Sequence, residues 1–348
     1  MSSVAKLRDV AERAGVGVGT ASRAMSGRGY VDAETRQRIM TAAEELGYRP
    51  NTVARALRES KTRVVGLLLP DLANEFYTEA AAMLQHVLAA ADFDLIVSAS
   101  GNDPAAEVRG LQSLLDRRVD GIIHVPVDPA LAVPRSLPVV QLNRHSMPLQ
   151  VDAFVADDAY GIGELTTLAL QAGHTDIAFV TGGPIHSTSV ERLNAFRATV
   201  MAAGLVEDAA QSPRFRILAS EFTSQWGREA MHDLRSDLPT VVVAASSRIA
   251  LGVLHACRDL NISVPDQLSL VAHGTPEWYE AFSPAITSYA PPLAEIGHAA
   301  ATAILGLIGD ESTEASESAA GTPVITKLHG AVHIRGSLVS PPPNGESR

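Results

Sequence analysis

A short polar stretch near the N-terminus carries side chains that can hydrogen-bond to the edges of DNA bases: Thr20, Ser22 and Arg23. An arginine suits guanine because its planar fork matches two acceptors of that base. The preceding residues, Val18 and Gly19, donate no side-chain hydrogen bond. Val18 is therefore limited to apolar contact with a thymine methyl group. Base reading through this stretch depends on a helix that presents it to the major groove.

The surrounding sequence predicts that helix and the turn before it. Apolar residues recur at helical spacing in a first segment, at Leu7, Val10, Ala11 and Ala14. Gly15 then supplies a turn, and a second short helix is predicted from about Val18 to Met25 with Ala21 and Ala24 facing inward. Two short helices joined by a tight glycine-containing turn are typical of a helix-turn-helix, whose second helix enters the major groove.

A third helix is predicted to complete this unit. Asp32 precedes the apolar pattern of Ile39, Ala42, Ala43 and Leu46, and its carboxylate can accept from a backbone N–H of the first turn. Gly47 suits the left-handed position that ends a helix, and Pro50 stops its continuation. The glycines 15, 17 and 19 do not indicate a dinucleotide loop, because no strand precedes them and Ser22 stands where a third glycine would be needed.

Charge is divided unevenly along the chain. The first 63 residues contain 12 Lys and Arg against seven Asp and Glu, whereas the whole chain has a net charge of −11. A basic end on an acidic body concentrates the attraction for phosphates at the predicted helix-turn-helix and disfavours nonspecific DNA contact elsewhere.

The N-terminal segment resembles the DNA-binding headpiece of the LacI/GalR family of bacterial transcription regulators. The shared residues are Asp9, Val10, Ala11, Ala14, Gly15, Val16, Thr20, Ser22, Arg23, Thr35, Arg36, Glu45, Leu46, Gly47, Tyr48, Pro50, Asn51, Ala54, Arg55 and Leu57. Two departures lie at the DNA surface: Gly17 stands where the family usually has Ser or Thr as a helix cap, and Val18 and Gly19 occupy the positions that usually read bases.

The resemblance implies a hinge helix that folds on DNA within residues 51–62, with Asn51, Ala54 and Arg55 among its DNA-binding residues. Paired Leu57 side chains from two subunits would then wedge a base step open in the minor groove and kink the duplex. The alternative for Leu57 is a packing role between domains. The stretch from Thr52 to Arg58 is too short to be a stable helix by itself.

The remaining chain is long enough for two lobes of ordinary domain size. Of all residues, 46% are hydrophobic, which predicts a large packed core. The single cysteine, Cys257, lies in an apolar helical pattern and is expected to be buried. Because the chain has no second cysteine, a disulfide within it is excluded, which fits a reducing cytoplasm. Neither a signal peptide nor a membrane-spanning run is found, and no cofactor or metal is expected.

Apolar strand-like runs alternate with helical runs through the body, which predicts an α/β fold with parallel sheets covered on both faces. The runs form two similar series, as in the family's two-lobed, periplasmic-binding-protein-like effector domain. We expect a headpiece over residues 1–50, a hinge over 51–62, a body over 63–340 and a flexible tail over 341–348. By the resemblance, lobe 1 comprises about 63–160 and 293–323, and lobe 2 about 161–292 and 324–340.

Ligands of open parallel sheets bind beyond the carboxyl ends of the strands, which places the effector site between the lobes. From lobe 1, Asn74, Phe76 and Tyr77 follow a strand, and the family has a similar Asn and aromatic pair there. The two aromatic residues suit stacking on sugars or bases, or they begin a helix and pack. His124 ends another strand and either reaches the cleft or is satisfied locally.

From lobe 2, Arg192 lies in a stretch that matches the family's arginine that binds the effector. The alternative is that Arg192 forms a purely structural salt bridge. Asp157 is a weaker candidate that otherwise caps a helix. Ser246 and Ser247 stand where sugar-responsive members usually carry Asn-Asp, and His273-Gly274 stands where they carry a further carboxylate. A pocket with an arginine and without these carboxylates favours a phosphorylated sugar, a nucleoside or a small organic acid over a neutral hexose.

These patterns lead to a functional expectation: a homodimeric, cytoplasmic repressor that binds a roughly palindromic double-stranded operator and responds to a small-molecule effector. The alternative is a small-molecule-binding module without regulated DNA binding, against which the headpiece argues. No nucleophile elbow, zinc-protease motif or Walker A loop is present, so we expect no enzyme activity.

Overall fold

The computed structural model describes residues 5–26, 29–48, 61–204, 214–309 and 322–341. Contacts between Cα atoms divide the chain into two compact units, Met1–Arg63 and Val64–Arg348. We call the second unit the body and treat each unit by itself. The expected hinge falls almost wholly outside the described residues, as do the residues of the expected tail beyond 341.

Within the described residues, the N-terminal unit contains three helices, α1 (Leu7–Ala14), α2 (Val18–Ser26) and α3 (Ala33–Glu45). A small core of alanines, Val10 and Ile39 holds them together. Gly15 adopts the left-handed conformation (φ 67°) in the turn before α2, and Gly47 does so after α3 (φ 60°). The carboxylate of Asp32 accepts the Thr35 N–H at 2.9 Å. These features confirm the predicted helices, the Asp32 cap and most of the inward-facing positions, whereas Leu46 of the predicted third-helix pattern is exposed.

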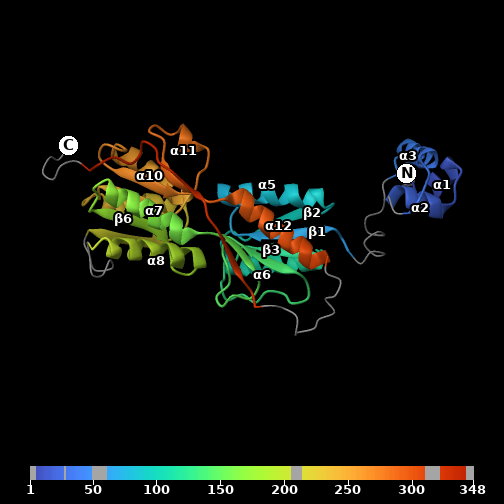
Figure 1. Cartoon of the computed structure of the whole chain (residues 1–348), viewed down its shortest axis with the longest axis horizontal. Coiled ribbons are helices and arrows are strands. Elements are labelled where there is room, and N and C mark those ends of the chain that lie inside the picture. The colour runs from blue at the N-terminus through green and yellow to red at the C-terminus, as the bar shows by residue number, and fades with distance from the viewer. Residues whose placement is uncertain (1–4, 27–28, 49–60, 205–213, 310–321, 342–348) are drawn as a thin grey trace. The chain divides into compact units, whose positions relative to one another are not determined.

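The described residues of the body form two sheets of six strands each (Figure 1). The first sheet is parallel throughout and has the order β11 (Ile325–Leu328), β5 (Ala153–Ala156), β4 (Val139–Leu142), β3 (Gly121–His124), β1 (Val64–Leu69) and β2 (Asp94–Ala99). The second has the order β12 (Ala331–His333), β10 (Thr287–Ala290), β9 (Ser269–His273), β8 (Val241–Ala244), β6 (Ile177–Gly182) and β7 (Phe215–Ser220). Only the pairing of β12 with β10 is antiparallel among the strands described.

Helices cover both faces of each sheet, which confirms the predicted α/β architecture. Around the first sheet, α5 (Glu75–Ala90) and α12 (Leu293–Gly309) pack together on one face and α6 (Pro104–Asp116) packs on the other. The second sheet is covered by α7 (Asp158–Gln171), α8 (Ser187–Ala202), α9 (Ser224–Leu234), α10 (Ser247–Leu260) and the short α11 (Trp278–Ala281). Apolar runs such as 241–244 are wholly buried because helices exclude water from both sides of the strand.

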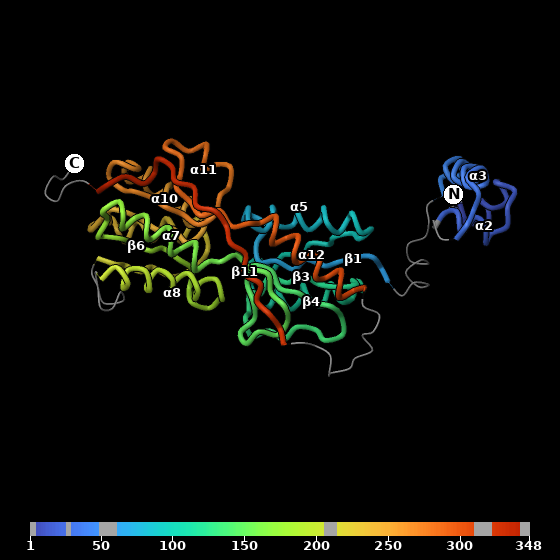
Figure 2. The backbone as a smooth tube through the Cα atoms, in the orientation of Figure 1, coloured from blue at the N-terminus to red at the C-terminus, as the bar shows by residue number. Residues whose placement is uncertain are grey.

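The chain crosses between the two lobes at three places: from β5 to α7, from β10 to α12, and from β11 to β12 (Figure 2). The third crossing corrects one predicted boundary. Residues 324–340 were assigned to lobe 2, but β11 pairs with β5 and so extends the first sheet, with Ile325 opposite Ala153. Backbone pairing with an exposed edge of the first sheet decides the position of this short strand, whose mixed side chains carry little pattern. Lobe 2 begins with α7 at Asp158, which packs on β9 and β10, close to the predicted start at about residue 161.

Two further predictions concern the burial of Cys257 and the character of the helices. Cys257 is 3% exposed, and burial raises the pKa of its thiol to about 12, as expected of a small core residue. Over the described part of the chain, none of the helices combines the length and the apolar character that crossing a bilayer requires.

Candidate functional site

The outward face of α2 carries the residues that were predicted to read DNA. Val18, Gly19 and Arg23 are exposed, while Thr20 and Ser22 are half-buried. The residue before the helix, Gly17, has no side chain to act as a cap, and its carbonyl accepts the N–H groups of Thr20 and Ala21. The remaining predicted DNA contacts, Asn51, Ala54, Arg55 and Leu57, lie outside the described residues.

Arg23 is held along the surface of α2. Its Nε lies 3.4 Å from the carbonyl oxygen of Gly19, and its Nη2 lies 3.5 Å from the hydroxyl of Thr20. Both distances are at the long end of the range for hydrogen bonds. The two contacts place the Arg23 side chain along the outward face of α2, the predicted recognition helix.

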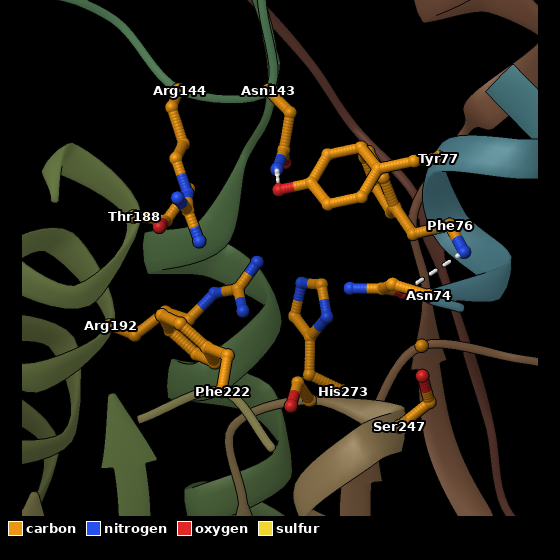
Figure 3. Close-up of a pocket in the computed structure, with 12 residues that line it drawn as sticks. Asn74, Phe76, Tyr77, Asn143, Arg144, Thr188, Arg192, Phe222, Ser247 and His273 are labelled. Carbon is orange, nitrogen blue, oxygen red and sulfur yellow. Dashed lines mark hydrogen bonds between the residues drawn. The ribbon is translucent and has the colours of Figure 1, made fainter. Parts of the chain in front are cut away.

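A pocket with a cavity volume of about 40 Å³ lies in the body where strands of both sheets end (Figure 3). The lining residues are Asn74, Phe76, Tyr77, Asn143, Arg144, Thr188, Arg192, Phe222, Ser246, Ser247, His273 and Gly274. Most of them follow the carboxyl ends of parallel strands, which is the position expected for a ligand of such sheets.

The first lobe contributes an aromatic and amide wall. Asn74 is the cap of α5 and accepts the Phe76 N–H at 3.1 Å. The rings of Phe76 and Tyr77 meet edge to face with centroids 5.3 Å apart. Tyr77 also packs into the core of the lobe, and its hydroxyl accepts a hydrogen bond of 3.2 Å from the Asn143 amide. Both alternatives for the aromatic pair therefore hold at once: the residues pack at the start of a helix and line the pocket.

Arg192 provides the charged part of the second-lobe wall. It projects from α8 and is 5% exposed. Its Nη1 donates to the carbonyl of Ala245 at 2.6 Å, and its Nη2 donates to Asp158 at 2.9 Å. The Nε atom is buried and has no partner within the described residues. Arg192 is thus both a buried structural ion pair and a pocket residue with donor capacity left over.

Asp158 connects Arg192 to His273. The Nε2 atom of His273 lies 2.8 Å from the same Asp158 oxygen that Arg192 contacts. Burial by itself would raise the pKa of Asp158, but the charge of Arg192 and the hydrogen bond from His273 lower it below its usual value. Burial and the charge of Arg192 lower the pKa of His273. The network therefore contains one cation, one anion and a neutral imidazole at neutral pH.

The start of α10 forms another side of the pocket. Ser246 caps this helix through a hydrogen bond of 3.2 Å from the Ile249 N–H to its hydroxyl, and Ser247 begins the helix. Gly274 faces Ser247 and has a left-handed φ of 101°. Of the residues predicted for the effector site, the structure therefore brings Asn74, Phe76, Tyr77, Arg192, Ser246, Ser247 and His273 to one pocket.

Two predicted site residues lie elsewhere. His124 is 1% exposed and contacts the buried carboxylate of Glu107 at 2.8 Å, which corresponds to the local alternative. Glu107, a residue of α6, also accepts the N–H groups of Val127 and Asp128. His124 therefore belongs to a buried hydrogen-bond network around the Glu107 carboxylate. Asp157 caps α7 by accepting the Tyr160 N–H at 2.9 Å. Neither residue lines the pocket.

Four lining residues were not predicted: Asn143, Arg144, Thr188 and Phe222. A signal was available for the first two, because they directly follow the apolar run that forms β4, and the same rule selected Asn74 after another strand. Thr188 lies four residues before Arg192 and so on the same helix face. Nothing in the sequence distinguished Phe222, which follows β7, an edge strand without a clear apolar run.

The comparisons with known proteins agree with this arrangement. Residues 6–51 match the model of bacterial regulatory proteins of the lacI family, and residues 167–327 match the periplasmic binding protein-like domain. The ribose operon repressor of Haemophilus influenzae is 30% identical over 311 residues, which cover 87% of this chain and 91% of that repressor. The chain belongs to the LacI family. It is a DNA-binding transcriptional regulator with an effector-binding body.

Two other relatives extend the comparison. Catabolite control protein A of Priestia megaterium is 28% identical over 319 residues, which cover 88% of this regulator and 94% of that protein. The lac repressor dimer bound to operator and the anti-inducer ONPF superposes with a TM-score of 0.81, at 20% identity, over 97% of this chain and all of that one. The second similarity shows that the fold is shared.

The recognition helix leads to a first prediction. Replacement of Arg23 by alanine should weaken binding to a selected operator by about 1–3 kcal/mol if the side chain reads a guanine, with little change for random DNA. Both affinities are measured at one salt concentration, after selection of an operator from random sequences. Arg38→Ala, an exposed arginine of α3, is the matched control and should keep the ratio of the two affinities. An unchanged ratio in Arg23→Ala would show that another residue reads the bases.

The buried network leads to a second prediction. Asp158→Ala leaves Arg192 without its carboxylate in a dry site, and it should lower the free energy of unfolding by about 3–5 kcal/mol. Asp157→Ala removes a helix cap and a contact with the exposed His329 at the neighbouring position, and it should cost about 1 kcal/mol. Urea denaturation of the two variants measures the difference. Equal losses would mean that the ion pair does not stabilise the second lobe.

Proposed function

We propose that this regulator is a homodimeric repressor whose affinity for a roughly palindromic operator is controlled by a small anionic effector in the pocket between the lobes. Phosphorylated sugars and small organic acids are the favoured classes. Nucleosides are less favoured, because a neutral nucleoside would leave the donors of Arg192 without a charged acceptor.

The charge of the lining is the observation that carries the effector class. Arg192 has an unused donor, and none of the described lining residues bears a carboxylate. Vicinal hydroxyl groups of a neutral sugar are commonly held by carboxylates that accept from them, and here Ser246, Ser247 and Gly274 occupy the corresponding places. Asp158 is the carboxylate nearest to Arg192, but it is 2% exposed and already accepts from Arg192 and His273.

Helix termini support the same sign of charge. Asn74 caps α5, Thr188 lies in the first turn of α8, and Ser246 caps α10, so three helices begin at the pocket. The N-terminus of a helix carries a partial positive charge and unpaired N–H groups. Converging termini add to the field of Arg192 and favour a negatively charged ligand.

A ligand panel tests this function directly. Operator affinity is measured by fluorescence anisotropy in the presence of phosphorylated sugars, small organic acids, nucleosides and neutral hexoses. We expect an anionic compound to change operator affinity by about 1–3 kcal/mol, because an effector acts only through unequal affinity for the two states. Arg192→Lys keeps the charge but loses the planar fork, and it should weaken the response while the protein stays folded.

Two outcomes would contradict the proposal. A neutral hexose that binds at micromolar concentration and shifts operator affinity would exclude the anionic class. An undiminished response in Arg192→Ala, with folding verified by circular dichroism, would exclude Arg192 as the anchor.

The family resemblance supplies a prediction for the hinge. Leu57→Ala should reduce operator affinity and DNA bending, because an apolar wedge that opens a base step is lost, while the melting temperature of the free protein stays nearly the same. A circular-permutation gel assay measures the bend. Leu72→Ala, an exposed leucine of the body, is the control and should bend DNA like the unaltered protein. Equal bending by all three proteins would assign Leu57 to packing instead.

A further inference from the structure

Arg144 is a buried cation that has no partner for much of its guanidinium group. It is 4% exposed, and its Nε and Nη1 atoms are buried without a hydrogen-bond acceptor among the described residues. No described carboxylate forms an ion pair with it. Buried donors of this kind are costly to leave unpaired, and the cost is greatest for a charged group. An arginine in this state indicates that its acceptor is a ligand.

The backbone directs Arg144 into the pocket. Asn143 ends β4 in the left-handed conformation (φ 62°), which asparagine tolerates better than most residues. The Asn143 amide donates to the hydroxyl of Tyr77. On the other side of Arg144, His145 donates its N–H to the hydroxyl of Ser187 at 3.0 Å. The chain on both sides of Arg144 is thereby fixed, first to lobe 1 and then to the start of α8 in lobe 2.

Arg144 and Arg192 approach the same space from different lobes. The guanidinium carbons lie 5.7 and 5.6 Å from the centroid of the Phe222 ring, and both side chains extend toward the centre of the pocket in Figure 3. Both guanidinium groups thus lie near one aromatic ring, whose face offsets only part of the repulsion between two like charges. A dianion between them would remove the repulsion and satisfy the unused donors.

The first turn of α8 adds donors from a third direction. Its cap residue, His186, makes no side-chain cap hydrogen bond, and Thr188 lines the pocket. Burial and the charge of Arg144 lower the pKa of His186 to about 4, so this imidazole is neutral near pH 7 and brings no competing charge. The N–H groups of an uncapped helix start are suited to a phosphate oxygen.

We propose that Arg144 and Arg192 together hold a phosphate monoester of the effector, with the Phe222 ring beside it and the first turn of α8 behind it. This assignment rests on the proposed function and narrows its ligand class. A phosphate presents three terminal oxygens in different directions, whereas a carboxylate presents two in one plane. Donors that converge from two lobes and a helix terminus therefore match a phosphate better than a carboxylate.

Inorganic phosphate is the probe for this site. Calorimetric titrations of the full chain compare phosphate with acetate at constant ionic strength. We expect phosphate to bind in the millimolar range or tighter and acetate to bind more weakly. Arg144→Gln should weaken phosphate binding about tenfold or more, since it removes a charged donor from the phosphate. Arg144→Lys should keep part of the affinity, and Arg235→Gln, an exposed arginine at the end of α9, should keep all of it.

Urea denaturation without phosphate separates a ligand-binding role from a structural one. Because Arg144 has no ion-pair partner, Arg144→Gln should leave the stability of the ligand-free protein unchanged or increase it. An arginine with a structural role would show a clear loss of stability instead. Such a loss, with phosphate binding as in the unaltered protein, would overturn the assignment of Arg144.

The remaining outcomes distinguish this inference from the proposed function. Unchanged phosphate binding in Arg144→Gln overturns the second anchor and leaves an anionic effector on Arg192 intact. Acetate binding as tight as that of phosphate overturns the phosphate assignment. Absence of phosphate binding to the unaltered protein at tens of millimolar also overturns it, whereas the proposed function is judged separately by the response of operator binding to the ligand panel.

Discussion

The buried contact between Arg192 and Asp158 is the interaction on which the second-lobe side of the pocket depends. It joins α8 to the first turn of α7, and His273 extends the link to the end of β9. Desolvation of both charges is costly, and the pair is tolerated because each partner also hydrogen-bonds to a further group, Ala245 or His273. The same bonds fix the orientation of the guanidinium, so a ligand meets a donor group that needs no reorganisation.

The two lobes play different parts at the pocket. The first lobe provides two aromatic rings, amides, Arg144 and the start of α5, and the second provides the ion pair, the Phe222 ring, two serines and the starts of α8 and α10. Contacts between the lobes are already made at the rim, where Arg144 lies by Phe222 and His145 donates to Ser187. An effector placed among these groups touches both lobes at once, and a change in the relation between the lobes is the kind of two-state element that an allosteric regulator requires.

The sequence predicted the elements whose patterns are strongest. Runs such as 64–69 and 241–244 are apolar throughout because helices bury both faces of the strand, and this periodicity can be read without a structure. The edge strands β7 and β11 escaped prediction since one side of each stays exposed and their side chains alternate less regularly. Arg192 was found through a family motif. Arg144 was not, because its role depends on the left-handed turn at Asn143 and on a ring from the other lobe. His124 was misplaced because its partner, Glu107, is adjacent only in the folded lobe.

The return of α12 to the first sheet has a consequence for the order in which the lobes are completed during synthesis. Ile296, Ala300 and Ile304 fill the same core as β1, β3 and β4, although most of the second lobe lies between them in the chain. A ribosome adds about 5–20 residues per second, so the apolar face that α12 covers stays open for on the order of ten seconds after β5 is made. The first lobe is thus begun first but completed only after most of the second lobe has been made, and β12 then adds the last strand to the second sheet.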